Sequence, residues 1–356
     1  MPEKYATCQC TVRFLTPAFL GGAFQQGQWR TPPFKALLRQ WWRVVYAASR
    51  QYKVDVLQMR QLEGELFGNA WLEKEVNGRT ESDARRSLVR LRISPWEDGA
   101  RRSWDDVKPL IATHPRTEVS VNAHYYLGFG LLKRQKGGKI LLEDGRSAID
   151  SGQQARWMIA FPLSMQQEIR RVLQLVDDFG SVGGRSRNGW GSLRLSFKQP
   201  YSRFQPPTRP WQDALQLDWP HCIGADSRGP LIWSTKKSFP NWQLAMQALA
   251  QLKIEMRAEF SFHRTDGKSG PGPGHWLAYP VTGHEVKGWE QARLPNSLRF
   301  RVRPAPDNPN HLIGVIFHMP CLPPPSFEPE RNVIIRVWQH VHQFLDKHPQ
   351  LQRTQE

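Results

Sequence analysis

The sequence predicts an α+β protein built from two tandem ferredoxin-like modules. Once insertions are set aside, strand-like and helix-like segments between residues 7 and 197 follow the order βαββαβ, which is the ferredoxin-like plan used by RNA-recognition domains. A proline-rich stretch at 201–210 then interrupts the pattern as a linker would. A second, less regular succession of strands and helices follows. We therefore expect a first domain at 1–200 and a second at 211–356.

The first strand and helix are the clearest elements. Residues 7–15 alternate and are rich in β-forming side chains, which predicts a strand. After a loop containing a Gly-Gly pair, Thr31 and Pro32 are suited to be the N-cap and the first residue of a helix that ends near residue 50. The residues expected on its packed face are Phe34, Leu38, Trp41 and Val45. The opposite side carries Lys35, Arg39, Arg43 and Arg50.

The rest of the first domain is read in the same way. A helix is expected at 53–72, followed by a strand at 88–93 in which arginines alternate with apolar residues. Between about 95 and 152 the pattern weakens, and we interpret this part as an insertion with a mobile basic loop at 133–139. The remaining predicted elements are a strand at 155–163, a helix at 165–178 and a strand at 192–197.

The second domain has fewer clear patterns. The predicted strands lie at 231–234, 275–281, 297–303 and 311–319, and the predicted helices lie at 242–259 and 330–347. No final strand is evident. Gly267-Lys268-Ser269 imitates the end of a phosphate-binding loop, but Phe262 stands where that motif needs glycine, so we interpret it as a turn.

The charge balance favours a polyanionic partner. The chain has 49 Lys plus Arg and 32 Asp plus Glu, a formal net charge of +17. Residues 1–200 hold 31 basic and 19 acidic residues, and the rest holds 18 and 13. Fifteen tryptophans add rings on which bases can stack. No apolar segment is long enough to span a membrane, and no signal peptide or dense cysteine pattern is visible. We expect an intracellular, cytoplasmic protein without metal or other cofactor.

The main candidate site is a glycine-rich loop at 179–193, between a predicted helix and a predicted strand. Its glycines allow positive φ angles and close backbone approach, and Arg185 and Arg187 supply forked donors for phosphate oxygens. The loop glycines are Gly180, Gly183, Gly184, Gly189 and Gly191. A nucleotide-binding loop is excluded because Trp190, not lysine, follows Gly189. The sequence thus predicts a loop that follows a phosphate backbone, and a merely solvated loop is the alternative.

Trp190 lies between two glycines and has two possible roles. Its ring either packs into the core or stacks on a base or ribose. We predict that it anchors the loop to the core and that Arg185 and Arg187 make the RNA contact.

Several motifs resemble a known family. Residues 16–23 (TPAFLGGA) and 30–43 (RTPPFKALLRQWWR) resemble the N-terminal signature of the first subunit of the Cmr complex, the type III-B CRISPR effector. Residues 65–68 (ELFG) and 293–300 (RLPNSLRF) resemble further segments of that subunit. The glycine loop resembles the one shared by the wider RAMP (repeat-associated mystery protein) superfamily. Phe34 departs from the pattern, where a smaller or aliphatic residue is expected.

The resemblance implies a non-catalytic RNA-binding subunit of a ribonucleoprotein that serves antiviral defence. Such a subunit contacts the backbone of guide and target RNA near the 3′ end of the guide, beside another RAMP subunit. Its implied partners are CRISPR guide RNA, target RNA and other Cmr subunits. The RNA-binding residues implied by position are Gly21, Gly22, Arg30, Lys35, Arg39, Arg43, Gly183, Gly184, Arg185, Arg187, Gly189 and Gly191.

The alternative is a metal-independent endoribonuclease of the RAMP type. That chemistry needs a histidine, or a neighbouring acid and base, to activate a ribose 2′-OH. The candidates are His114, His124 and His263, but none belongs to a recognisable constellation. We therefore predict a protein that is not an enzyme. The sequence leaves open which RNA strand is contacted, which subunits touch it and the oligomeric state before assembly.

Overall fold

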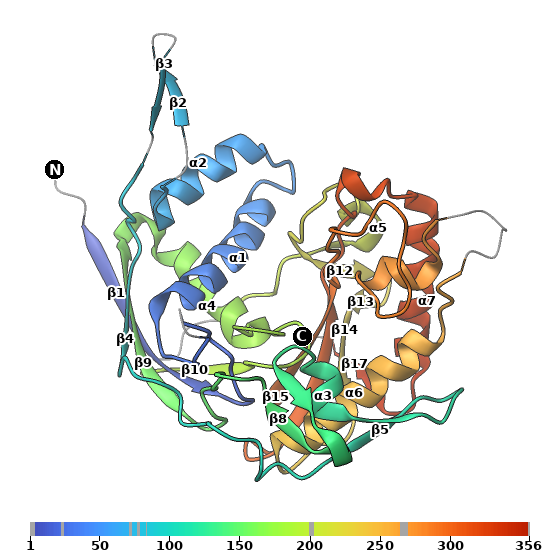
Figure 1. The fold of residues 1–356 in the computed structure, drawn as a ribbon. Coiled ribbons are helices and arrows are strands. Elements are labelled where there is room, and N and C mark those ends of the chain that lie inside the picture. The colour runs from blue at the N-terminus through green and yellow to red at the C-terminus, as the bar shows by residue number, and fades with distance from the viewer. Residues whose placement is uncertain are drawn as a thin grey trace.

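The computed structural model describes residues 4–354 apart from 23–24, 71–72, 77–78, 83, 199–202 and 264–269. Its first module is a four-stranded antiparallel sheet in the order β10-β1-β9-β4. Two helices lie on one face of this sheet (Figure 1). The elements, in chain order, are β1 (Tyr5–Phe14), α1 (Thr31–Ser49), β4 (Arg90–Ser94), β9 (Gln154–Pro162), α4 (Gln166–Phe179) and β10 (Leu193–Phe197). This order and strand arrangement confirm a ferredoxin-like module.

The second module repeats the plan, with the sheet order β15-β16-β14-β17. Its elements are β14 (Ile232–Thr235), α6 (Trp242–Ala258), β15 (Leu298–Pro304), β16 (Leu312–His318), α7 (Arg331–Lys347) and β17 (Leu351–Arg353). The closing strand that the sequence did not reveal is β17. It has three residues, of which Leu351 alone is buried, so it shows too little alternation to be recognised. The predicted α+β class with two tandem modules is confirmed.

The other elements connect or decorate the two modules. Within the first module's sequence they are α2 (Val56–Phe67), β2 (Glu73–Val76), β3 (Arg79–Ser82), β5 (Ile111–Thr113), β6 (Ser120–Asn122), α3 (Ala123–Leu127), β7 (Leu132–Arg134), η1 (Lys136–Gly138), β8 (Ile140–Leu142) and η2 (Leu163–Met165). Later in the chain they are β11 (Thr208–Pro210), α5 (Trp211–Ala214), β12 (Ile223–Asp226), β13 (Gly229–Pro230), η3 (Pro273–Leu277) and η4 (Pro325–Phe327).

The modules pack as alternating layers: the first sheet, then α1 and α4, then the second sheet, then α6 and α7 (Figure 1). The ring of Trp41 on α1 lies 5.8 Å from that of Phe179 on α4 and 6.5 Å from that of Phe317 on β16. Because α1 lies between two sheets, it is buried around most of its circumference. The buried set is Phe34, Leu37, Leu38, Trp41, Trp42, Val44, Val45, Tyr46 and Ala47. The prediction that only one side of this helix packs is wrong.

The insertion at 95–152 packs against the second module. His124 Nε2 lies 3.1 Å from the Gln243 carbonyl oxygen, and the Thr113 amide donates to Gln251 Oε1 over 2.8 Å. Within the insertion, α3 begins after Asn122, whose side chain caps the helix by accepting from the Tyr125 amide. The basic segment 133–139 lies in the β7–β8 hairpin. The insertion therefore joins the two modules.

One predicted strand of the second domain is wrong. Residues 275–281 begin within η3, where His275 Nδ1 accepts from the Gly272 amide over 3.1 Å. Among the residues that the structure describes, no helix is both long and apolar enough to cross a membrane.

Candidate nucleic-acid interface

The glycine loop lies at the junction of the two modules. It follows α4, leads into β10 and runs beside β15 of the second module. The Phe300 amide donates to the Arg187 carbonyl over 2.9 Å, and the Val302 amide donates to Ser192 Oγ over 3.0 Å. The buried Arg301 guanidinium donates to the Leu193 carbonyl. Contacts made by the loop thus depend on how both modules are placed.

The N-terminal segment 16–22 fixes the other side of the loop. The Gly184 amide donates to the Phe19 carbonyl over 3.0 Å, and the Gly191 amide donates to the Pro17 carbonyl over 2.9 Å. Thr16 is fully buried; its hydroxyl donates to the Gly189 carbonyl over 2.7 Å and accepts from the Ser192 amide. The N-terminal segment and the glycine loop, two of the segments that carry the family resemblance, therefore form one hydrogen-bonded unit.

Glycine is required in this loop by contacts within the protein. Gly191 has φ +63°, and a Cβ there would lie 1.9 Å from the Val182 carbonyl oxygen. Gly183 has φ +96°, and its Cβ would lie 2.7 Å from the Phe19 carbonyl oxygen. An L side chain at either position meets both a strained backbone and a clash with main-chain atoms. These glycines let the loop pack tightly, so their role does not by itself point to phosphate.

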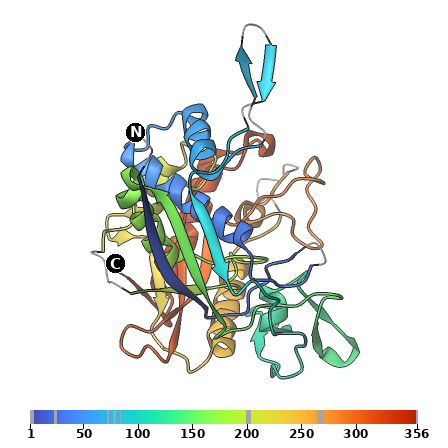
Figure 2. The same ribbon diagram turned by 90° about the vertical axis from the view of Figure 1, so that its left-hand side faces the viewer.

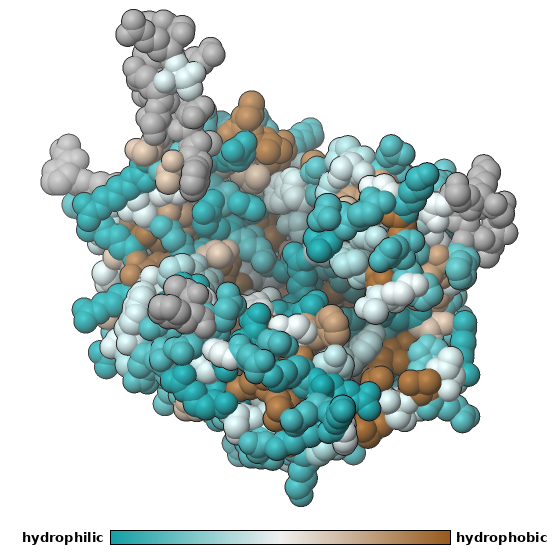
Figure 3. All heavy atoms as spheres, viewed as in Figure 1, coloured by the Kyte–Doolittle hydropathy of each residue, from teal (hydrophilic) through white to brown (hydrophobic). Residues whose placement is uncertain are grey.

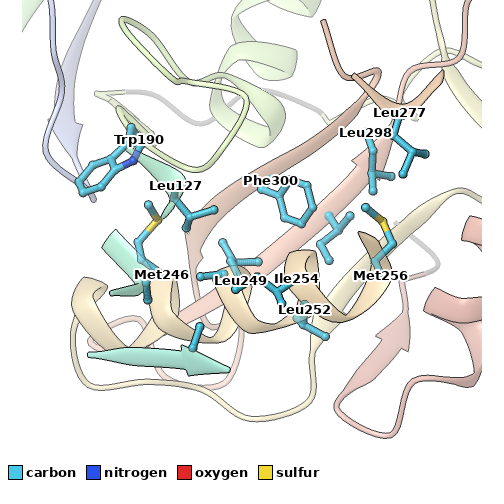
Figure 4. Packing of buried hydrophobic residues seen from close by; sticks show 14 of the residues in the cluster. Leu127, Trp190, Met246, Leu249, Leu252, Ile254, Met256, Leu277, Leu298 and Phe300 are labelled. Carbon is cyan, nitrogen blue, oxygen red and sulfur yellow. The ribbon is translucent and has the colours of Figure 1, made fainter. Parts of the chain in front are cut away.

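Trp190 anchors the loop, as predicted. Its side chain is fully buried in an aromatic cluster. The ring lies 5.5 Å from that of Phe19, 5.6 Å from that of Trp104 and 5.8 Å from that of Trp242. Figure 4 shows it beside Leu127 and Met246 above α6. Its ring is therefore not offered to a base, and the loop is held by a cluster drawn from both modules and the insertion.

A cleft of about 1020 Å³ opens beside the loop. The face seen in Figure 3 is hollowed between the modules, and mostly hydrophilic residues surround the hollow. The cleft is bounded by the glycine loop, by the segment 278–283 and by β15. The basic residues that line it are Arg185, Arg187, Lys253, Arg293 and Arg299. Glu285 and Glu290, both exposed, are its acidic residues.

The basic groups of the cleft lack ion-pair partners within the part of the chain that the structure describes. Among the described residues, none of these five side chains has a carboxylate within ion-pair distance. Arg299 is only 8% exposed and its Nε has no hydrogen-bond partner in the described part of the chain. Burial, reinforced by the nearby Arg187, lowers the pKa of Arg299 to about 9. A buried cation without a counter-ion is unfavourable, so a bound anion would be stabilised here.

Lys253 of α6 lies at the wall of the same cleft. Its ammonium group donates to Asn188 Oδ1 over 2.7 Å and lies 5.6 Å from the centre of the Phe300 ring. Burial, and then the positive charges of Arg257 and Arg185, lower the pKa of Lys253 to about 7. Arg185 is held towards the cleft by the bond from its Nε to the Phe129 carbonyl, 2.7 Å long.

The basic side of α1 has a different environment. Arg39 Nε lies 2.6 Å from Glu63 Oε1, and Arg43 binds both carboxylate oxygens of Glu63 over 2.8 Å. The Glu63 side chain is only 3% exposed, whereas those of the two arginines are 40% and 43% exposed. Burial, and then Arg39, lower the pKa of Lys35. Arg39 and Arg43 are therefore partners of a buried carboxylate as well as candidates for RNA contact.

The remaining predicted residues lie in the N-terminal loop. Arg30 donates to the Gly21 carbonyl, and the Gly22 amide donates to the Gln26 carbonyl over 2.9 Å. Of the predicted site residues, the cleft brings together Arg185 and Arg187. It is not lined by Gly21, Gly22, Arg30, Lys35, Arg39 or Arg43, although Gln40 of α1 reaches it.

Three basic residues of the cleft were missed by sequence reasoning. Arg293 and Arg299 belong to the segment 293–300 that carries part of the family resemblance. In β15, Arg299, Arg301 and Arg303 alternate with buried apolar residues, a period of two that indicates one basic face. Lys253 gave no signal, because it lies within an apolar helix and no pattern in the sequence marks it.

The histidines proposed for a nuclease lie elsewhere. No histidine lines the cleft among the described residues. His124 is fully buried, and burial lowers its pKa to about 4. The His114 ring accepts from the amides of Arg116 and Thr117 over 3.3 Å, and the His263 ring lies 6.2 Å from that of His284. The His124 ring packs 6.3 Å from that of Trp190 in the core, but the structure places none of the three histidines in the cleft.

The fold and the site place this protein in a class: tandem α+β proteins in which two ferredoxin-like modules meet at a glycine loop beside a basic cleft. A sequence model of the RAMP superfamily matches residues 11–194, slightly more than half of the chain, and the protein belongs to that superfamily. The crystal structure of Cmr1 from Pyrococcus furiosus in its apo form is similar with a TM-score of 0.46 and 13% sequence identity, over 98% of each chain. A comparison with curated proteins finds no match.

Proposed function

We propose that the protein is a non-catalytic RNA-binding subunit of a type III-B CRISPR effector complex. Membership of the RAMP superfamily and the N-terminal motifs described above support this role. The proposed ligand is the sugar–phosphate backbone of guide and target RNA near the 3′ end of the guide, with sequence discrimination left to base pairing. The proposed partners are a neighbouring RAMP subunit and other Cmr subunits in the cytoplasm.

One observation carries the proposal. The cleft places Arg187, Arg299 and Lys253 beside one another without a carboxylate partner among the described residues. Guanidinium groups suit phosphate oxygens because their donors form a planar fork. A cleft of this volume and charge accommodates a phosphodiester chain better than a small neutral ligand.

The test is RNA binding by a cleft variant, Arg187→Gln with Arg299→Gln. We expect weaker binding of labelled single-stranded RNA in fluorescence anisotropy, and a salt slope reduced by about 0.7 for each lost phosphate contact. The matched control, Arg134→Gln with Arg336→Gln, removes two exposed arginines that do not line the cleft. Equal behaviour of the two variants would reject the cleft as the RNA site.

The same protein tests the nuclease alternative. Incubation of the purified chain with labelled RNA in EDTA should leave the RNA intact. Cleavage that disappears in a histidine variant, such as His114→Ala or His263→Ala, would show an enzyme. Crosslinking of residues 183–191 in the assembled complex would identify which RNA strand they contact.

A further inference from the structure

The first sheet has a face that no element of the described chain covers. Helices α1 and α4 lie on one side of it, and its other side is open (Figure 2). The strand register assigns alternate residues to this outer face. They are Tyr5, Thr7, Gln9, Thr11 and Arg13 of β1, Arg90, Arg92 and Ser94 of β4, Gln154, Arg156, Met158, Ala160 and Pro162 of β9, and Arg194 and Ser196 of β10. Five of these residues are arginine and none is acidic.

The arginines of this open face are largely unpaired. Arg13, Arg90, Arg92 and Arg156 are exposed, and no described carboxylate lies within ion-pair distance of them. Arg194 reaches Asp177, with Nε 3.5 Å from Oδ1. It also lies directly opposite Arg13 in the ladder between β1 and β10. Like charges in that position are destabilising, so an anionic partner would relieve a repulsion that folding leaves in place.

The other side chains of the open face indicate the kind of anion. Its large apolar or aromatic members are Tyr5 and Met158, 37% and 38% exposed. The guanidinium carbon of Arg90 lies 4.9 Å from the centre of the Tyr5 ring. Two separated side chains do not form the apolar core that a protein interface needs. Guanidinium donors beside an accessible ring are instead suited to single-stranded nucleic acid, whose phosphates and bases they contact.

We propose that the open face of the first sheet binds a single-stranded RNA segment, on a surface separate from the cleft. Arg90 and Arg92 lie on β4, and Arg156 lies on the adjacent β9. Arg92 is paired in register with Met158, and Arg156 is paired with Ser94, so the three guanidinium groups lie within one small area. One RNA backbone that crosses these two strands contacts all three. The choice of RNA as the anion rests on the proposed function, whereas the site itself rests on the charge pattern.

The test compares two triple variants of the full chain. The sheet variant is Arg90→Gln, Arg92→Gln and Arg156→Gln, and the matched control is Arg60→Gln, Arg134→Gln and Arg336→Gln, which removes three exposed arginines elsewhere. With fluorescein-labelled oligouridine, we expect the sheet variant to lose affinity and its salt slope to fall by up to about 2, about 0.7 per contact. The control should keep the parent slope. Thermal melting verifies that both variants are folded.

Three outcomes would overturn the proposal. The first is an unchanged salt slope in the sheet variant, and the second is an equal loss of RNA affinity in both triple variants. The third is that the parent protein binds polyglutamate more tightly than oligouridine and that this polyglutamate binding is lost in the sheet variant but kept in the control. The last result would assign the face to an acidic protein. The cleft variant separates this proposal from the proposed function: loss in the cleft variant alone rejects only the sheet site, and loss in the sheet variant alone rejects only the cleft.

Discussion

The cleft beside the glycine loop and the basic side of α1 contain the same kinds of side chain in opposite electrostatic situations. In the cleft, Arg187 and Arg299 have no carboxylate partner among the described residues, and burial lowers the pKa of both groups. On α1, Arg39 and Arg43 share the buried carboxylate of Glu63. Arg187 and Arg299 therefore keep both of their positive charges for a ligand, whereas the two helix arginines, which share one carboxylate, retain a net charge of one.

This difference shows what a count of basic residues cannot reveal. An i, i+4 stripe of Lys35, Arg39 and Arg43 is visible in the sequence, but Glu63, which neutralises part of it, lies in α2. A paired arginine stabilises the fold and gains less from a phosphate, because binding the phosphate competes with the existing carboxylate. The partner of each cation, more than its position on a helix, distinguishes a binding surface from a structural one.

The largest expected effect comes from removing the anchor of the cleft. Trp190→Ala should lower the free energy of unfolding by about 3–5 kcal/mol, because it empties a fully buried aromatic site. The loop should also lose its fixed position beside β15. The folded fraction of the variant should therefore bind RNA more weakly than the parent. Chemical denaturation and RNA anisotropy measure the two effects.

Trp96→Ala is the matched control, since Trp96 is 56% exposed. Its stability should stay within about 0.5 kcal/mol of the parent. A Trp190→Ala protein that melts like the parent but loses RNA affinity would contradict the anchoring role and point to a ring that contacts RNA.

A smaller effect is expected from the partner of the α1 arginines. Glu63→Gln should cost about 1–3 kcal/mol of stability, because it leaves Arg39 and Arg43 without their carboxylate. The arginines are about 40% exposed, so water compensates them in part and the low end of this range is expected. RNA affinity should not fall, because the change frees two positive groups.

Glu65→Gln provides the comparison. Glu65 pairs with Arg85 at the surface, both about 40% exposed or more, and its loss should cost less than about 1 kcal/mol. If Glu63→Gln weakens RNA binding while remaining folded, the contrast between the two basic regions fails. The stripe would then be a positioned RNA site whose geometry depends on Glu63.

The fold was more predictable than the site, for physical reasons. The first module has long, strongly alternating strands such as β1 and β9, and its apolar helices are patterned, so the βαββαβ order could be recognised. β17 is too short to show alternation. The segment at 275–281 contains enough β-forming residues to imitate a strand, but the backbone of η3 is fixed instead by a side-chain bond to His275.

The site required contacts between distant parts of the chain. Arg185 and Arg187 could be proposed because glycines surround them in the sequence. Lys253 and Arg299 reach the same cleft only because the second module packs against the loop, through bonds such as that from Phe300 to Arg187. The pairing of Arg39 with Glu63 is equally tertiary. Sequence patterns identified the loop, while the composition of the cleft followed from the packing of the two modules.

The smallest expected effect is a pH dependence located in the cleft. The pKa of Lys253 falls from its ordinary value to about 7, so the unfolded chain binds more protons than the folded one between about pH 7 and 10. For this group alone, stability therefore rises with pH across that window. A bound phosphate acts in the opposite direction, because it favours the charged lysine. RNA affinity should then decrease as pH rises through 7, by less than about tenfold per pH unit.

Lys253→Arg sharpens the comparison with α1, because arginine stays charged throughout this pH range. The variant should bind RNA with an affinity that changes little between about pH 6.5 and 8.5, the range over which a group of pKa about 7 titrates, whereas the affinity of the parent declines across this range. Lys35→Arg, which alters the α1 side instead, should keep the pH dependence of the parent. If the RNA affinity of the parent does not decline across this window, RNA does not keep Lys253 charged. Lys253 would then not be a titrating group linked to RNA binding, and it would not distinguish the cleft from the paired arginines of α1.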